Sequence, residues 1–138
     1  MGRKAKKSSL EWVSEITDDV RVSVASEPLI KNSDPLRGVF AFSYTIKIEN
    51  TGPQTVQLLE RHWIIKSNGM QVGEVVGPGV VGEQPVLEGG EKFEYSSGAV
   101  IQDPYGSMEG TYTFRARDGR FFAVNIPKFD LFYPLVIH

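Results

Sequence analysis

The feature that most constrains this chain is an alternation of apolar and polar residues with a period of two. The longest run covers residues 40–48, where one side of an extended chain carries Phe40, Phe42, Tyr44, Ile46 and Ile48. Shorter runs begin near residues 20, 112 and 122. Because successive side chains of a strand leave opposite faces of a sheet, this pattern predicts half-buried β-strands. The best helix candidate, Leu10–Ile16, is short and has no strong cap.

Turn residues separate the alternating runs. Asn68-Gly69 and Asp118-Gly119 are typical of two-residue hairpin turns, in which both central residues need a positive φ. Asn50–Pro53 and Gly89-Gly90 mark further turns. Seven or eight mostly antiparallel strands are therefore predicted, near residues 20–27, 38–50, 55–66, 70–76, 85–88, 91–99, 109–118 and 121–127. With no room for crossover helices between them, these strands predict an all-β sandwich of two sheets.

One predicted strand, Val56–Lys66, breaks the alternation. Leu58 and Leu59 are adjacent, and the apolar face changes before Trp63. A β-bulge would explain the change, because one extra residue moves all later side chains to the other face. A strand buried on both faces is the alternative.

The length of 138 residues fits one domain. We predict a flexible basic leader over residues 1–17 and the sandwich domain over residues 18–138. Met1–Lys7 carries four basic residues and no acidic ones, which leaves 11 basic against 17 acidic residues in the remainder. This acidic balance disfavours a nucleic-acid-binding face, which needs positive charge near the phosphates.

The composition also bounds the compartment and the partners. The chain contains no cysteine, which excludes disulfides, thiolate metal sites and cysteine nucleophiles. Apolar runs are shorter than the roughly 20 residues of a transmembrane helix, and no apolar stretch follows the basic start as in a signal peptide. We therefore expect a cytoplasmic protein with no membrane partner. The apolar segment Phe129–Ile137 is expected to pack on its own sheet or against a second copy in a homodimer.

Gly77, Gly79 and Gly82 match the pattern G-x-G-x-x-G. In dinucleotide-binding folds this motif follows a strand and opens a helix, whose N-terminus holds the pyrophosphate. Glu74–Val76 can supply the strand, but Pro85 follows three residues after Gly82 and no βαβ unit surrounds the motif. Two interpretations remain. One is a tight connection whose glycines provide positive φ or close packing, and the other is a loop whose backbone N–H groups bind an anion.

Residues for catalysis or metal binding are few. His62 and His138 are the only histidines, and two histidines without cysteine are too few for a structural zinc site. His62 is expected to be a structural or surface imidazole. The carboxylates are scattered, without a spacing that pairs two of them for acid–base chemistry. We therefore predict no catalytic residues, no metal site and no cofactor.

Several separate motifs resemble the ApaG family, and they occur in the family's order. The residues that carry the resemblance are Arg61–Ile65, Val76–Pro85, Phe93–Gly98, Met108–Tyr112 and Phe122–Ile126, with Pro127, Phe129 and Leu131. The strands upstream, from Val20, also fit. The resemblance implies a fibronectin type III-like, or immunoglobulin-like, β-sandwich.

The resemblance also implies a bacterial stand-alone protein with no established catalytic activity. The family is associated with cobalt and magnesium resistance and, by gene neighbourhood, with diadenosine tetraphosphate metabolism. Its eukaryotic relatives carry the domain beside F-box or polymerase-interacting regions, where it looks like an interaction module. By analogy, Gly77, Gly79 and Gly82 are a suggested pyrophosphate site. We expect a non-catalytic protein-interaction module whose protein partner is unknown. The alternatives are a binder of nucleotide polyphosphate through the glycine-rich loop and a phosphohydrolase.

Overall fold

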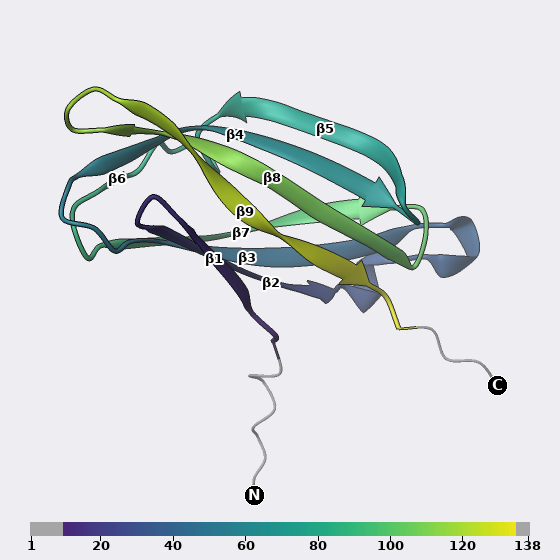
Figure 1. Ribbon diagram of the computed structural model, residues 1–138. Helices are drawn as coiled ribbons and strands as arrows, with labels where there is room; N and C mark the ends of the chain where they lie inside the picture. Colours follow the sequence, from purple (N-terminus) through teal and green to yellow (C-terminus); the bar gives the residue numbers. More distant parts are fainter. Residues whose placement is uncertain (1–9, 135–138) are drawn as a thin grey trace, which may run out of the picture.

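The computed structural model describes residues 10–134, which form two antiparallel sheets packed face to face (Figure 1). The first sheet has the order β1-β2-β3-β7, with β1 (Val13–Thr17), β2 (Val20–Pro28), β3 (Phe40–Asn50) and β7 (Lys92–Ile101). The second has the order β5-β4-β8-β9, with β4 (Val56–Ser67), β5 (Met70–Pro78), β8 (Tyr105–Ala116) and β9 (Phe121–Phe132). The short strand β6 (Val86–Leu87) pairs with the start of β4.

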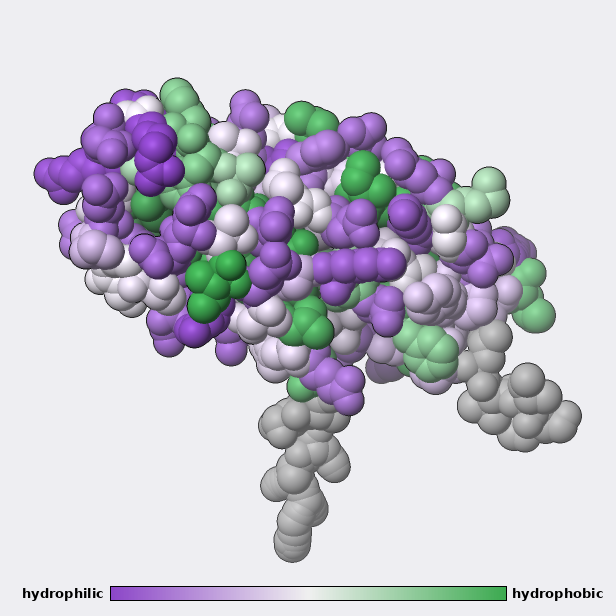
Figure 2. All heavy atoms as spheres, viewed as in Figure 1, coloured by the Kyte–Doolittle hydropathy of each residue, from purple (hydrophilic) through white to green (hydrophobic). Residues whose placement is uncertain are grey.

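Two short 3₁₀ turns, η2 (Ile30–Asn32) and η3 (Pro35–Arg37), connect β2 to β3. Residues 10–134 contain no α-helix, which confirms the predicted all-β sandwich. Nothing helical in this part of the chain is long and apolar enough to cross a membrane. Figure 2 shows apolar side chains distributed among polar ones over the visible face.

The core lies between the sheets and is built from the alternating residues. Both sheets contribute the largest fully buried side chains: Phe42, Ile46, Ile48, Leu58, Ile101, Tyr112, Phe114 and Leu131. Full burial of such a side chain stabilises the fold by about 1.5–3 kcal/mol. The inter-sheet layer is therefore the main source of stability, and it fixes which face of each strand remains available to ligands.

A β-bulge causes the change of face in β4, which confirms the first of the two explanations predicted from the sequence. The register to β8 shifts between Leu58 and Glu60, which leaves Leu59 as the extra residue. Beyond the bulge, Trp63 is buried, and Arg61 lies on the same inner face two residues before it.

The helix candidate Leu10–Ile16 is wrong, because Val13–Thr17 forms the strand β1 and pairs with β2. The Asp18-Asp19 turn joins these strands with positive φ at both residues (48° and 65°). Aspartate tolerates this conformation, so the pair replaces the more familiar Asn-Gly. The end of the predicted leader, 1–17, therefore belongs to the sandwich, whereas residues 1–9 lie outside the described residues.

The two predicted hairpin turns differ. Asn68 and Gly69 both have positive φ (51° and 83°), as expected for type I′. In the β8–β9 connection only Gly119 does (92°), and its N–H donates to the carbonyl of Ala116 at 2.9 Å. This is a type I turn followed by a left-handed glycine, the usual three-residue hairpin loop, so the two-residue prediction for Asp118-Gly119 is wrong.

Strand β9 extends to Phe132, five residues beyond its predicted end. Pro127 does not terminate it, because the register to β8 shifts there and β9 lies at the edge of its sheet. Phe129, Leu131 and Tyr133 are buried in the core. The apolar tail therefore packs on its own sheet as far as Tyr133, and its last residues, 135–137, lie outside the described residues.

Candidate functional site

The predicted glycine-rich segment forms a tight turn after β5. The N–H of Val80 donates to the carbonyl of Glu83, and the N–H of Glu83 donates back to Val80, both at 2.8 Å. The central residues Val81 and Gly82 have φ values of 41° and 80°, as in a type I′ turn. No helix follows within the described chain, so the helix N-terminus that holds pyrophosphate in dinucleotide-binding folds is missing here.

Each glycine of the motif has a structural reason to be glycine. At Gly77 a Cβ atom would lie 3.2 Å from the Arg61 guanidinium. At Gly79, where φ is 63°, it would lie 2.3 Å from the carbonyl oxygen of Glu83. Gly82 also has a positive φ, but a Cβ there would meet no atom within 4 Å. The segment thus needs its glycines for a close approach at two positions and for turn geometry at the third.

Few backbone donors of this segment are free for an anion. Gly79 donates to the carbonyl of Leu59 at 2.7 Å, Val80 is used within the turn, and Pro78 has no N–H. Within 78–82, only the N–H groups of Val81 and Gly82 have no acceptor among the described residues. Anion binding at this loop stays a prediction, and it would depend on two donors at an exposed tip.

Arg61 is the residue near this loop that sequence reasoning missed. It lies on the inner face of β4, with Gly77 of β5 on one side and Tyr112 of β8 on the other. Its Nη1 donates to the carbonyls of Pro78 and Gly79, both at 2.9 Å. The guanidinium therefore fastens the loop to the sheet. The bulge was the available signal, because it turns Arg61 inward.

A tyrosine cluster lies next to Arg61 between the two sheets. The hydroxyls of Tyr95 and Tyr112 share a hydrogen bond. Burial raises the pKa of both groups well above the ordinary value, and the positive charge of Arg61 acts in the opposite direction. Burial also raises the pKa of Tyr44. These hydroxyls stay protonated at neutral pH, which suits a structural role in joining the sheets.

His62 lies on the outer face of β4. Its Nε2 is 2.7 Å from Oε2 of Glu74, and both side chains are about half exposed (43% and 50%). No group of three or more His, Asp or Glu side chains that could hold a metal ion occurs among residues 10–134. His138 lies outside the described residues. The pair is therefore a surface contact between neighbouring strands, as expected for His62.

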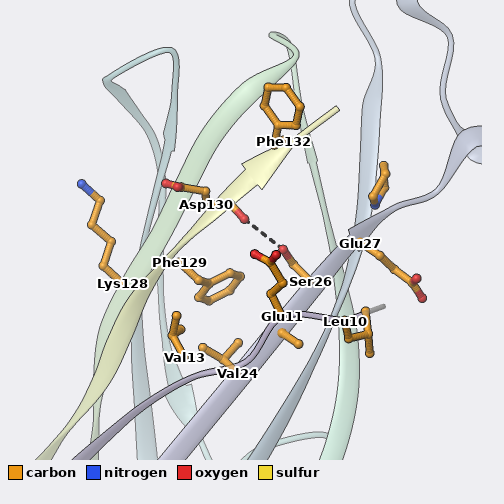
Figure 3. Close-up of a pocket in the computed structure, with 12 residues that line it drawn as sticks. Leu10, Glu11, Val13, Val24, Ser26, Glu27, Lys128, Phe129, Asp130 and Phe132 are labelled. Atoms are coloured by element: carbon orange, nitrogen blue, oxygen red, sulfur yellow. Dashed lines mark hydrogen bonds between the residues drawn. The ribbon is translucent and has the colours of Figure 1, made fainter. Parts of the chain in front are cut away.

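A cleft of about 530 Å³ opens between β2 and β9 (Figure 3). It lies where the edges of β2 and β9 are not paired with a further strand in the described part of the chain. β1 pairs with β2 only as far as Val24, so among residues 10–134 no strand pairs with Ala25–Pro28 on that side. β9 is the last strand of its sheet. The side chain of Ser26 bridges the gap by donating to the carbonyl of Asp130 at 2.9 Å.

The cleft combines an apolar floor with a mainly acidic rim. Its floor includes Val24 and Phe129, and Figure 3 shows the Phe129 ring pointing into it. The charged residues that line it are three carboxylates and one ammonium: Glu11, Glu27, Asp130 and Lys128. Figure 3 shows Glu11 pointing into the space between the strands, whereas Glu27 and Lys128 point away. Phe132 at the rim is 64% exposed.

This arrangement suits an extended peptide with apolar and basic side chains, because a free strand edge offers backbone hydrogen bonds and the rim offers negative charge. No pattern in the sequence predicted the cleft. Its two sides are more than 100 residues apart, and the helix candidate Leu10–Ile16 concealed the edge strand that begins beside it.

Comparisons with known proteins agree with this description. The ApaG domain, as a protein family, matches residues 30–116, more than half of the chain. Protein ApaG of Acidithiobacillus ferrooxidans is 48% identical over 120 residues, which cover 87% of this chain and 94% of that protein. Protein ApaG of Nitrosomonas europaea is 49% identical over 119 residues, which cover 86% of this chain and 94% of that protein.

A solved structure shares the fold as well. The crystal structure of a protein from Bordetella pertussis, described as ApaA, superposes with a TM-score of 0.82 at 43% identity. The match covers 86% of this chain and 96% of that one. The two-sheet architecture and the glycine turn after β5 agree with the family match and with these relatives. The chain therefore belongs to the ApaG family.

Proposed function

We propose that this protein is a non-catalytic interaction module that binds an extended segment of a partner protein in the cleft between β2 and β9. The single observation that carries the proposal is the edge of β2 at Ala25–Pro28, which no strand within residues 10–134 pairs with on that side and which faces the edge strand β9 across an apolar floor. Strand edges of this kind are natural templates for pairing with another chain.

The charge of the rim favours a basic ligand. Three carboxylates against one ammonium give the cleft a net negative charge. Side chains of an extended ligand alternate between the cleft and solvent, so apolar residues can meet the floor while basic residues reach the rim. Charge complementarity of this kind raises the association rate and discriminates against acidic segments.

Selection from a library of random nine-residue peptides tests the proposal. We expect enrichment of peptides that alternate apolar residues with Lys or Arg. Their binding to Glu11→Lys and Phe132→Ser should be weaker by about tenfold or more, because these changes reverse a rim charge or remove an exposed anchor. Glu88→Lys, an exposed site outside the cleft lining, makes the same charge change and should bind like the wild type.

Mapping by backbone NMR locates the ligand. The largest shift changes are expected in Ala25–Pro28 and in the last residues of β9. Peptides that bind the cleft variants and the wild type equally well, or a library that yields no binder, would rule out the cleft as a peptide site.

A further inference from the structure

A second charged surface lies at the other end of β9, on the outer face of the second sheet. Arg115 and Arg117 are both exposed and line the same hollow. Among residues 10–134, neither has a carboxylate within 4 Å. Asp118, the next residue, directs Oδ1 to the backbone N–H of Arg120 at 3.0 Å. Two unneutralised like charges this close together repel each other, and a bound anionic group would relieve that repulsion.

The hollow beside these arginines measures about 250 Å³ and also includes Thr55, Gln57 and Val86 in its lining. Gln57 would otherwise occupy its centre, because it lies between Val86 and Arg115 in the strand register. Its Nε2 instead donates to the carbonyl of Gln84 at 3.1 Å. The amide is thereby held toward the glycine-rich connection, and the space next to the arginines stays open.

Exposed apolar side chains stand at both ends of the row of residues that crosses this surface. The register places Val86, Gln57, Arg115 and Phe121 in one row across β6, β4, β8 and β9. At the two ends of this row, Val86 is 55% and Phe121 is 64% exposed. Figure 2 shows strongly polar and apolar side chains together at the end of the molecule where the β8–β9 turn lies. Arginine combined with aromatic side chains is typical of the residues that dominate protein interfaces.

We infer that this surface, the arginine patch (Arg115, Arg117, Val86 and Phe121), binds an acidic, extended segment of a protein partner. Carboxylates two residues apart in an extended segment are spaced by roughly 7 Å, as are side chains two residues apart on a strand. Each guanidinium can hold a carboxylate through two parallel hydrogen bonds. An apolar residue of the same segment can then contact Val86 or Phe121. The patch is separate from the cleft and takes the opposite charge.

Fluorescence polarisation with two labelled peptides tests the inference, one alternating Asp with Leu and the other Lys with Leu. The acidic peptide should bind. Arg115→Ala and Arg117→Ala should each weaken it about five- to tenfold, because a charge-assisted contact is lost. Arg37→Ala removes an exposed arginine that is paired with Asp34 elsewhere and should have no effect. Salt should weaken the binding, since the contacts are exposed charges.

Three outcomes would overturn the inference. They are no binding of the acidic peptide, an equal loss in Arg37→Ala, and equally tight binding of inorganic polyphosphate, which would mean unspecific attraction of anions. Glu11→Lys and Phe132→Ser, the cleft variants, should leave the affinity for the acidic peptide unchanged. If the acidic peptide does not bind, the peptide selection still tests the cleft. If the selection yields no binder for the cleft, the polarisation measurement still tests the arginine patch.

Discussion

The glycine-rich turn makes a sharp prediction, because two of its glycines both have a positive φ but lie in different surroundings. Both Gly79 and Gly82 have positive φ (63° and 80°). A methyl group at Gly79 would lie 2.3 Å from the carbonyl oxygen of Glu83 and 3.0 Å from its carbonyl carbon, whereas at Gly82 it would meet nothing within 4 Å. Alanine at the two positions therefore carries a similar cost for its positive φ, and the main difference is the clash at Gly79.

The magnitudes follow from the contacts. The left-handed conformation costs a non-glycine residue roughly 1–2 kcal/mol. At Gly79 the clash is with backbone, so the turn has to move. The Val80–Glu83 hydrogen bond, worth about 1 kcal/mol, is lost or weakened. The fully buried Val80 side chain also loses part of its burial, worth about 1–2 kcal/mol. We expect Gly79→Ala to lower the free energy of unfolding by about 3–5 kcal/mol, and Gly82→Ala by about 1–2 kcal/mol.

Urea unfolding, followed by the fluorescence of the buried Trp63 and by far-UV circular dichroism, measures both values. Equal losses in the two variants would refute the assignment of Gly79 to a steric role. Weaker nucleotide binding in Gly82→Ala, in a protein of nearly normal stability, would support the anion-binding interpretation of the loop instead.

Two further predictions concern buried polar groups. Asn50 is 1% exposed and donates to the carbonyls of Gln54 and Leu87 while its Oδ1 accepts from a backbone N–H, so Asn50→Ala should lower the free energy of unfolding by about 2–4 kcal/mol in urea titrations. Because burial raises the pKa of Tyr95 and Tyr112, their contribution to stability is complete below about pH 10 and is lost at higher pH. Stability measured from pH 8 to 11.5 should fall above pH 10, and the fall should be shallower in Tyr112→Phe. An equal fall in that variant would contradict the linkage.

Much of the fold could be predicted from the sequence. A strand buried on one face has apolar and polar residues in alternation, and this pattern is visible within a few consecutive residues. The exceptions have local causes. The strand Val13–Thr17 was missed because its turn is formed by Asp18-Asp19, which is a less familiar hairpin signal. The end of β9 was missed because Pro127 normally stops a strand, and here the register shift absorbs it. Both errors concern elements at sheet edges, where fewer contacts constrain the sequence.

The candidate sites were less predictable, since each is assembled from residues that are distant along the chain. The cleft joins Ser26 to Asp130, and the hollow of the arginine patch joins Gln57, Val86 and Arg115. Only the strand register brings such residues together. The glycine motif was visible in the sequence, yet its closest functional group, Arg61, depends on the bulge in β4 for its direction. A short motif therefore located the turn but did not reveal what lies against it.

The cleft and the arginine patch should act independently, and the length of β9 gives the reason. The strand begins at Phe121 in the patch and ends at Phe132 in the cleft, eleven residue steps or roughly 36 Å apart along a strand. Exposed charges interact weakly beyond about 8 Å at physiological ionic strength. Changes at such separated sites are additive within a few tenths of a kcal/mol. A double variant Glu11→Lys/Arg115→Ala should therefore lose basic and acidic peptide binding by the same factors as the two single variants. A larger or smaller loss would mean that β9 couples the two surfaces mechanically.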